Sequence, residues 1–77
     1  MQKMKLTFGE KIRNLREDAN LTQEQLGKQV NMTQRKVSYI EHNQYEPSIE
    51  DIKALCSFFK VSSDYLIGLS NNPEKKK

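Results

Sequence analysis

Apolar residues recur along this chain at the three- and four-residue spacing of an amphipathic α-helix. In the first such stretch the apolar positions are Phe8, Ile12, Leu15 and Ala19. Thr7 stands just before the stretch and Glu10 follows it three positions later, which is the spacing of a capping box at a helix N-terminus. The pattern therefore predicts a helix that begins after Thr7 and ends at Asn20.

The next stretch predicts two short helices joined by a sharp turn. Thr22, with a glutamine three positions later, has capping-box spacing at the start of a helix over 23–30. Asn31 follows this helix, and asparagine tolerates the left-handed conformation that a tight helix end requires. Thr33 then supplies an N-cap hydroxyl for a helix over 34–42.

Helical geometry divides residues 34–42 into two faces. Val37, Ile40 and Glu41 fall together on one side. The other positions form a hydrogen-bonding surface: Arg35, Ser38, Tyr39 and His42 lie on the opposite side, Gln34 at its N-terminal edge and Lys36 on a flank. In the preceding helix, Gly27 costs about 1 kcal/mol against alanine, which indicates close approach of a neighbouring helix.

The second half of the chain predicts two more helices. Pro47 disfavours helix at the residue before it, and Ser48 is a favourable N-cap. The apolar stripe that follows consists of Ile49, Ile52, Leu55, Cys56 and Phe59. Either Ser62 or Ser63 caps a last short helix, which Gly68 ends. Because no stretch alternates like a strand, the pattern predicts an all-α, compact five-helix domain.

Composition changes this picture little. The chain has 77 residues, room for one small domain, which we place at 7–69. We expect 1–6 to be a flexible N-terminal arm and 70–77 a disordered charged tail. The net charge of +3 resides in these tails, which hold five of the thirteen basic residues and one of the ten acidic ones. Charge alone is therefore no argument for a nucleic-acid partner.

Several classes of protein are disfavoured. The single cysteine, Cys56, cannot form an internal disulfide, which points to a reducing compartment. One cysteine and one histidine are too few for a conventional zinc site, and nothing pairs a nucleophile with a base. No apolar run approaches a membrane span or a signal peptide. We expect a cytoplasmic protein that is not an enzyme and has no metal, cofactor or small-molecule ligand.

The stretch over 22–42 resembles the helix-turn-helix of the Cro and phage-repressor (XRE-like) DNA-binding proteins. The matching positions are Gln23, Leu26, Gly27, Val30, Asn31, Met32, Val37 and Ile40. The segment 61–68 is similar to the closing helix of that family. Asn31 in place of glycine and Gly27 in place of alanine are mild departures. The resemblance implies a lambda-repressor-like fold in which 34–42 is the recognition helix.

Four residues of the recognition helix are candidates for base reading: Gln34, Arg35, Ser38 and Tyr39. Glutamine can bond bidentately to adenine and arginine to guanine in the major groove. The resemblance implies base contact for Gln34 and phosphate contact for Gln23. Lys36 and Asn43 are better placed for phosphates. The alternative for all of these residues is that they belong to an ordinary solvated surface and contact no DNA.

Two further groups have predicted structural roles. The resemblance implies an ion pair between Arg16 and Glu41 that fixes the recognition helix. Phe58, Tyr65 and Leu69 suggest a homodimer contact, because Phe58 falls opposite the apolar stripe of its helix and the family commonly dimerises through its C-terminal helices. Scattered surface aromatics are the alternative.

The sequence thus predicts a sequence-specific DNA-binding transcriptional regulator, a repressor that binds a palindromic operator in double-stranded DNA as a homodimer. The rival hypothesis is a protein-interaction module, such as an antitoxin or anti-repressor partner. Polar residues on the recognition helix favour DNA, since a groove for a polypeptide would need apolar ones there. The operator sequence and the regulated genes are not encoded in these patterns.

Overall fold

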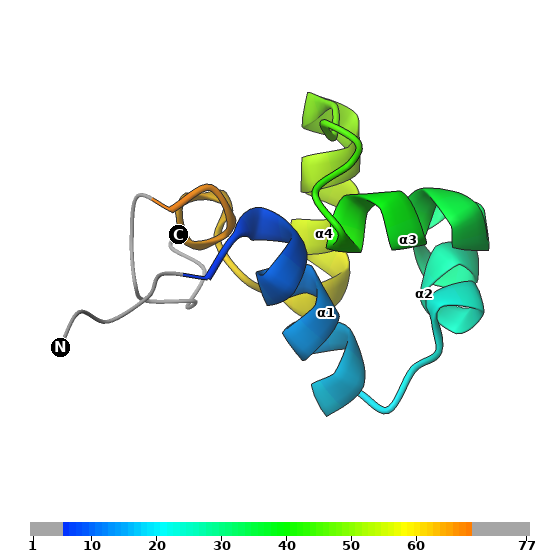
Figure 1. The fold of residues 1–77 in the computed structure, drawn as a ribbon. Coiled ribbons are helices and arrows are strands. Elements are labelled where there is room, and N and C mark those ends of the chain that lie inside the picture. The colour runs from blue at the N-terminus through cyan, green and yellow to red at the C-terminus, as the bar shows by residue number, and fades with distance from the viewer. Residues whose placement is uncertain (1–5, 69–77) are drawn as a thin grey trace, which may run out of the picture.

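The computed structural model describes residues 6–68, which form five α-helices joined by short loops (Figure 1). The helices are α1 (Phe8–Asp18), α2 (Gln23–Val30), α3 (Gln34–Glu41), α4 (Ile49–Phe59) and α5 (Ser63–Leu66). The α2–α3 pair lies on the opposite side of the molecule from α5, and α1 packs against α3 between them (Figure 1). The predicted all-α, five-helix fold is confirmed.

Each helix begins where a side-chain oxygen accepts a backbone N–H. The residues that do this are Thr7, Thr22, Thr33, Ser48 and Ser62. The first two form the predicted capping boxes. Ser48 forms a third box with Asp51, and the last helix is capped by Ser62 rather than Ser63. Such caps satisfy backbone donors that a helix start leaves open.

The helix ends explain how the loops stay short. Asn20, Asn31, Asn43 and Lys60 adopt positive φ angles of 59–60° just after α1, α2, α3 and α4. This left-handed conformation reverses the chain in one step, and asparagine adopts it more readily than most residues. The predicted left-handed turn at Asn31 is confirmed.

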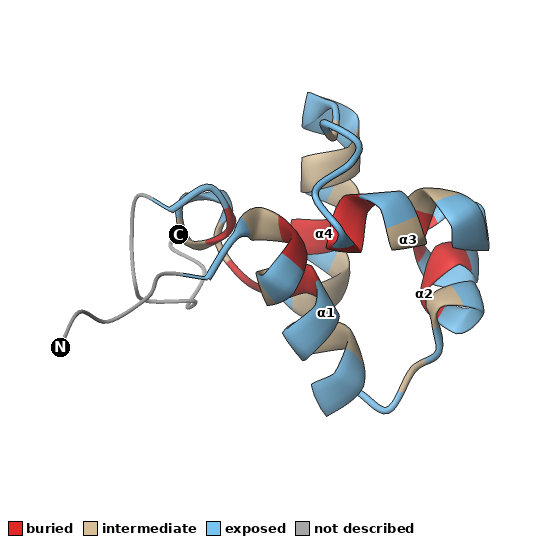
Figure 2. Cartoon of the chain, in the orientation of Figure 1, coloured by how far each residue is buried: buried red, intermediate tan, exposed pale blue. Residues whose placement is uncertain are grey.

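The core is a small apolar cluster to which every helix contributes. Its buried members are Ile12, Leu26, Val30, Val37, Ile40, Leu55, Cys56, Val61 and Leu66. Figure 2 shows these buried segments where α1, α3 and α4 meet and along the inner side of α2. The α2–α3 pair is therefore attached to the rest of the domain by its own apolar side chains.

Three sequence expectations are wrong in detail. Ile49 was assigned to the buried stripe of α4 but is 72% exposed, because it is the first residue of a helix whose first turn extends past α3 (Figure 1). Ala19 is exposed because it caps the end of α1. At Gly27 the close approach comes from the carbonyl of Met32 in the following turn, not from a neighbouring helix.

None of the helices over residues 6–68 is long and apolar enough to cross a membrane. The predicted N-terminal arm, apart from Leu6, and the predicted charged tail lie outside the described residues.

Candidate nucleic-acid interface

Helix α3 has one buried and one exposed face. Val37, Ile40 and Glu41 are buried against the domain. On the other side Gln34 and Arg35 are exposed, as are Tyr39 and His42, and Ser38 is half-buried. The four residues predicted to read bases thus lie on one helix, and three of them are open to solvent.

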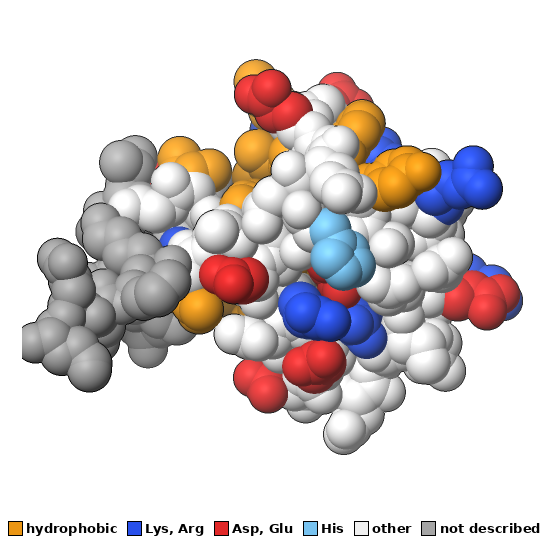
Figure 3. Space-filling view, in the orientation of Figure 1, with side chains coloured by type: hydrophobic (Ala, Val, Ile, Leu, Met, Phe, Trp, Pro, Cys, Tyr) orange, Lys and Arg blue, Asp and Glu red, His pale blue; other side chains and the backbone are white. Residues whose placement is uncertain are grey.

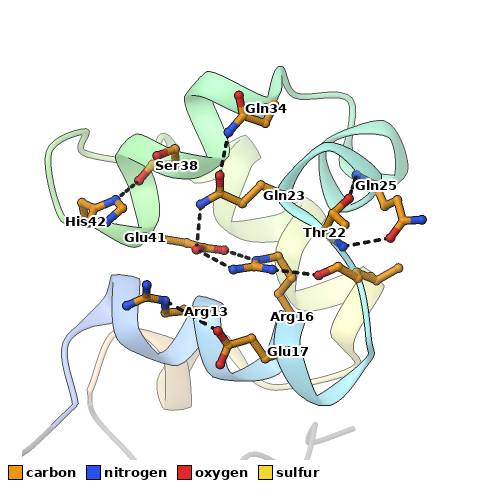
Figure 4. Close-up of polar contacts among 11 residues, drawn as sticks. Arg13, Arg16, Glu17, Thr22, Gln23, Gln25, Gln34, Ser38, Glu41 and His42 are labelled. Carbon is orange, nitrogen blue, oxygen red and sulfur yellow. Dashed lines mark hydrogen bonds and ion pairs between the residues drawn. The ribbon is translucent and has the colours of Figure 1, made fainter.

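Two glutamines connect this surface to the interior (Figure 4). Gln34 Nε2 donates to Gln23 Oε1 over 2.6 Å, and Gln23 Nε2 donates to Glu41 Oε1 over 3.1 Å. Gln23 is the first residue of α2 and Gln34 the first of α3. The structure therefore places the candidate phosphate residue beside the candidate base reader.

The structure also brings Arg16 and Glu41 together. Arg16 Nε lies 2.6 Å from Glu41 Oε2, and Arg16 Nη2 lies 3.1 Å from Glu41 Oε1. The side chains are only 12% and 1% exposed. The hydrogen bond to Glu41 raises the pKa of Arg16, against an opposing effect of burial. Arg16 Nη1 further donates to the carbonyl of Leu21, so one guanidinium ties α1 to α3 and to the start of α2.

Lys36 and Asn43, the other candidate phosphate residues, are held by the protein itself. Lys36 Nζ lies 3.0 Å from Asp51 Oδ1 and 5.2 Å from the centre of the Tyr45 ring, and the hydrogen bond to Asp51 raises its pKa. Asn43 Oδ1 accepts from the backbone N–H of Gly9 at 3.0 Å, and Asn43 Nδ2 donates to the Thr7 hydroxyl at 2.9 Å.

The bridging role of Asn43 was not predicted from the sequence. An asparagine directly after a helix end signals a left-handed turn, but nothing local indicates that its amide reaches residues more than thirty positions away. The contact of Lys36 with Asp51, 15 positions further along the sequence, was not predicted either.

The two described members of the predicted dimer contact, Phe58 and Tyr65, are not open to solvent as an exposed apolar group. Phe58 is half-buried against the core and meets the Phe59 ring edge to face at 5.0 Å. Tyr65 is also half-buried, beneath the ammonium of Lys11. Leu69 lies outside the described residues. The expectation that Phe58 points away from the core is wrong, because its side chain packs against the core cluster. Among the described residues, Ile67 and Leu6 are exposed apolar side chains at this end of the molecule, at 51% and 45%.

Charge does not mark out the interface. On the face shown in Figure 3, acidic and basic side chains are interspersed and form no continuous basic patch. Among the residues that the structure describes, no group of three or more His, Cys, Asp or Glu is placed to hold a metal ion.

The chain is similar to known regulators. A family model described as helix-turn-helix matches residues 12–66. The HTH-type transcriptional activator BcrR of Enterococcus faecalis is 37% identical over 62 residues, which cover 80% of this chain and 30% of that protein. The immunity repressor protein of Bacillus phage phi105 is 27% identical over 82% of this chain and 44% of its own length. This chain thus spans less than two thirds of these relatives.

Solved structures agree with the fold. The P22 c2 repressor protein, in complex with synthetic operator 9T, superimposes with a TM-score of 0.80 at 32% identity, covering 86% of this chain and all of that one. The restriction-modification controller protein C.AhdI from Aeromonas hydrophila gives a TM-score of 0.72 at 27% identity, over 78% and 91% of the two chains. With its two short capped helices, its left-handed turn at Asn31 and these matches, the chain belongs to the helix-turn-helix family, in its Cro and phage-repressor (XRE-like) branch.

Proposed function

We propose that this protein is a sequence-specific DNA-binding transcriptional regulator whose recognition helix is α3. The observation that carries the proposal is the division of α3 into a buried face, which fixes the helix, and an exposed face bearing Gln34, Arg35 and Tyr39. A B-DNA major groove about 12 Å wide accommodates one α-helix, whose N-terminal residues reach the base edges. Gln34 and Arg35 are the first two residues of α3.

Each base-reading residue has a matching chemistry. Arg35 can donate two parallel hydrogen bonds to guanine, and Gln34 can pair with the donor and acceptor of adenine. Ser38 and Tyr39 lie one turn further along, where a hydroxyl or an aromatic edge can meet a base or a thymine methyl group.

Gln23 is the strongest of the phosphate candidates. It occupies the first turn of α2, where backbone N–H groups and the helix dipole favour an anion. Lys36 has three ammonium donors, so it can bind a phosphate while one donor stays with Asp51. Asn43 Nδ2 has a second N–H besides the one that it donates to Thr7, so it can donate to a phosphate while both internal hydrogen bonds stay in place.

We further propose that the protein is a repressor and acts as a homodimer on a palindromic operator. The P22 c2 and phi105 relatives are named repressors, whereas BcrR is named an activator. Two-fold symmetric dimers of helix-turn-helix proteins bind half-sites about 34 Å apart, one turn of the duplex. Ile67, exposed just after α5, takes the place of Phe58 as the apolar centre of the proposed contact.

A gel-shift titration with random-sequence DNA in the presence of unlabelled competitor tests the proposal. We expect a retarded complex whose affinity falls steeply with salt, because phosphate contacts release counterions. If no complex forms at low salt while the protein is folded, the proposal is wrong and the rival protein-interaction module gains support.

A further inference from the structure

A chain of hydrogen bonds runs from the core to the surface of α3 and alternates strictly between donors and acceptors (Figure 4). Arg16 donates to Glu41, and Gln23 donates to the same carboxylate from its Nε2. Gln34 in turn donates to Gln23 Oε1. The series of hydrogen bonds passes through Glu41, whose side chain is 1% exposed, and ends at Gln34, which is open to solvent.

The buried carboxylate determines how the Gln23 amide is turned. A carboxylate paired with a guanidinium has only acceptor oxygens. The Gln23 amide has a donor end and an acceptor end of nearly the same shape, so either end fits the space. Only the NH₂ end can donate a hydrogen bond to Glu41 Oε1, which lies 3.1 Å away, whereas the carbonyl end would face another acceptor.

The orientation of Gln23 then determines that of Gln34. With its NH₂ group directed at Glu41, Gln23 directs its Oε1 acceptor at Gln34. Gln34 must therefore present a donor, and its Nε2 donates to Gln23 Oε1 over 2.6 Å. One N–H of Gln34 is thereby consumed. Its Oε1 and its second N–H are left for a ligand, as one acceptor and one donor.

We propose that Glu41 is a positioning residue for base recognition, whose carboxylate fixes the order of donor and acceptor on Gln34 and thereby selects adenine over guanine. The inference rests on the proposed function, in which Gln34 reads a base. Adenine offers an N6–H donor and an N7 acceptor in the major groove, which match one carbonyl and one N–H. Guanine offers two acceptors, O6 and N7, and gives the Gln34 carbonyl no partner.

Glu41→Gln removes this constraint with little change in shape. A glutamine at 41 can present either its carbonyl or its NH₂ to Gln23, so the Gln23 amide can turn over. Gln34 Oε1 then accepts from Gln23, and both N–H groups of Gln34 face outward, as guanine requires. Gln23→Leu removes the hydrogen bonds of Gln23 to Glu41 and to Gln34, and leaves the Gln34 amide free to rotate.

The test measures the ratio of affinities for two duplexes that differ by A·T against G·C at the base pair read by Gln34. That pair is the one at which Gln34→Ala loses its preference. We expect the wild type to favour adenine by about 5- to 150-fold, the range of one bidentate contact. In Glu41→Gln and Gln23→Leu the ratio should fall at least threefold. Val61→Ala changes a core residue that takes no part in these hydrogen bonds. It controls for lost stability and should keep the wild-type ratio.

A measurement on the free protein supplements this test. The side-chain amide ¹H–¹⁵N signals of Gln34 should shift in Glu41→Gln and Gln23→Leu, and stay in place in Val61→Ala. If Glu41→Gln does not fold, as judged by circular dichroism, Gln23→Leu decides, because Gln23 is only half-buried.

The possible failures are distinguishable. If Gln34→Ala abolishes the adenine preference while the folded Glu41→Gln and Gln23→Leu proteins retain it, the positioning role is overturned and the proposed function stands. An equal fall in Val61→Ala also overturns it, since specificity would then follow stability. If the wild type shows no base preference that Gln34→Ala removes, base reading by Gln34 has failed, and the inference fails with it.

Discussion

Single residues determine how closely α2 and α3 pack against their neighbours. Gly27 and Gly9 have no room for a side chain, because a Cβ atom would collide with the carbonyl of Met32 at the first and with backbone carbonyls at the end of α3 at the second. Asn43 joins the same end of α3 to the start of α1 through both ends of its amide. These contacts, together with the apolar core, set the position of α3.

Gly27→Ala tests the close approach. Alanine favours a helix by about 1 kcal/mol over glycine, but here the backbone of the turn must move, and overpacking of this kind costs about 1–3 kcal/mol. We expect a net loss of stability in urea denaturation. Lys28→Ala, at the exposed neighbouring position, should change stability by less than about 0.5 kcal/mol. A Gly27→Ala protein as stable as the wild type would show that the turn adjusts freely.

Asn43 separates a backbone effect from a hydrogen-bond effect. Asn43→Gly keeps the positive φ of 59° available but loses two hydrogen bonds, each contributing about 0.5–1.5 kcal/mol. Asn43→Ala loses them and adds about 1–2 kcal/mol of backbone strain. We therefore expect melting temperatures in the order wild type, glycine variant, alanine variant. Equal melting temperatures would contradict the stabilising role of both the hydrogen bonds and the backbone conformation of Asn43.

The helices differ in how far their sequence predicts them. Their caps were predictable because a Thr or Ser reaches only three residues along the chain. The burial of individual apolar residues was less predictable. The solvent exposure of Ile49 and Phe58 depends on where neighbouring helices begin and end. The link from Gln23 to Glu41 joins residues 18 positions apart and requires the tertiary fold.

The start of α4 should respond to acid. Burial raises the pKa of Asp51, but hydrogen bonds from Ser48 and Lys36 outweigh it, and the net pKa is lowered. A lowered folded-state pKa means that the stabilisation is complete above the ordinary value of about 3.9 and is lost as the pH falls through the folded value.

Asp51→Asn should therefore cost stability near neutral pH, by about 0.5–2 kcal/mol for the weakened cap and the lost ion pair. The difference from wild type should shrink below about pH 4, where the unfolded-state carboxyl becomes protonated. Chemical denaturation from pH 7 to pH 2.5 measures this. Glu50→Gln, in the same turn, is the matched control. A difference that is independent of pH would contradict the assignment to the ionised carboxylate.

The whole molecule has a proposed DNA-binding end and a proposed assembly end. The α2–α3 pair lies on one side and α5 with Ile67 on the other (Figure 1). In the proposed homodimer, this separation would let two copies meet through one end while each presents α3 to the duplex. The five-helix domain was predictable as a whole from its apolar spacing, whereas the burial of Phe58 was not, because it depends on how α4 packs against the core.

Ile67→Asp tests the assembly. Losing the burial of one isoleucine removes about 1.5–3 kcal/mol, so the dimer dissociation constant should rise at least tenfold in sedimentation equilibrium. Ile49→Asp provides the control, since Ile49 is more exposed, at 72% against 51%, and belongs to the first turn of α4 rather than to α5. A wild-type protein that is monomeric at micromolar concentration would contradict the homodimer itself.

The central claim, that α3 reads DNA sequence, is tested most directly by selecting bound sites from a random DNA pool with the wild type and with Arg35→Ala. We expect the wild type to enrich an inverted repeat with half-site centres about 10 base pairs apart. Arg35→Ala should lose the preference at a G·C pair in each half-site, equivalent to about 1–3 kcal/mol, and keep the rest of the sequence. A wild-type pool without enrichment, or an Arg35→Ala pool with the wild-type sequence intact, would contradict the claim.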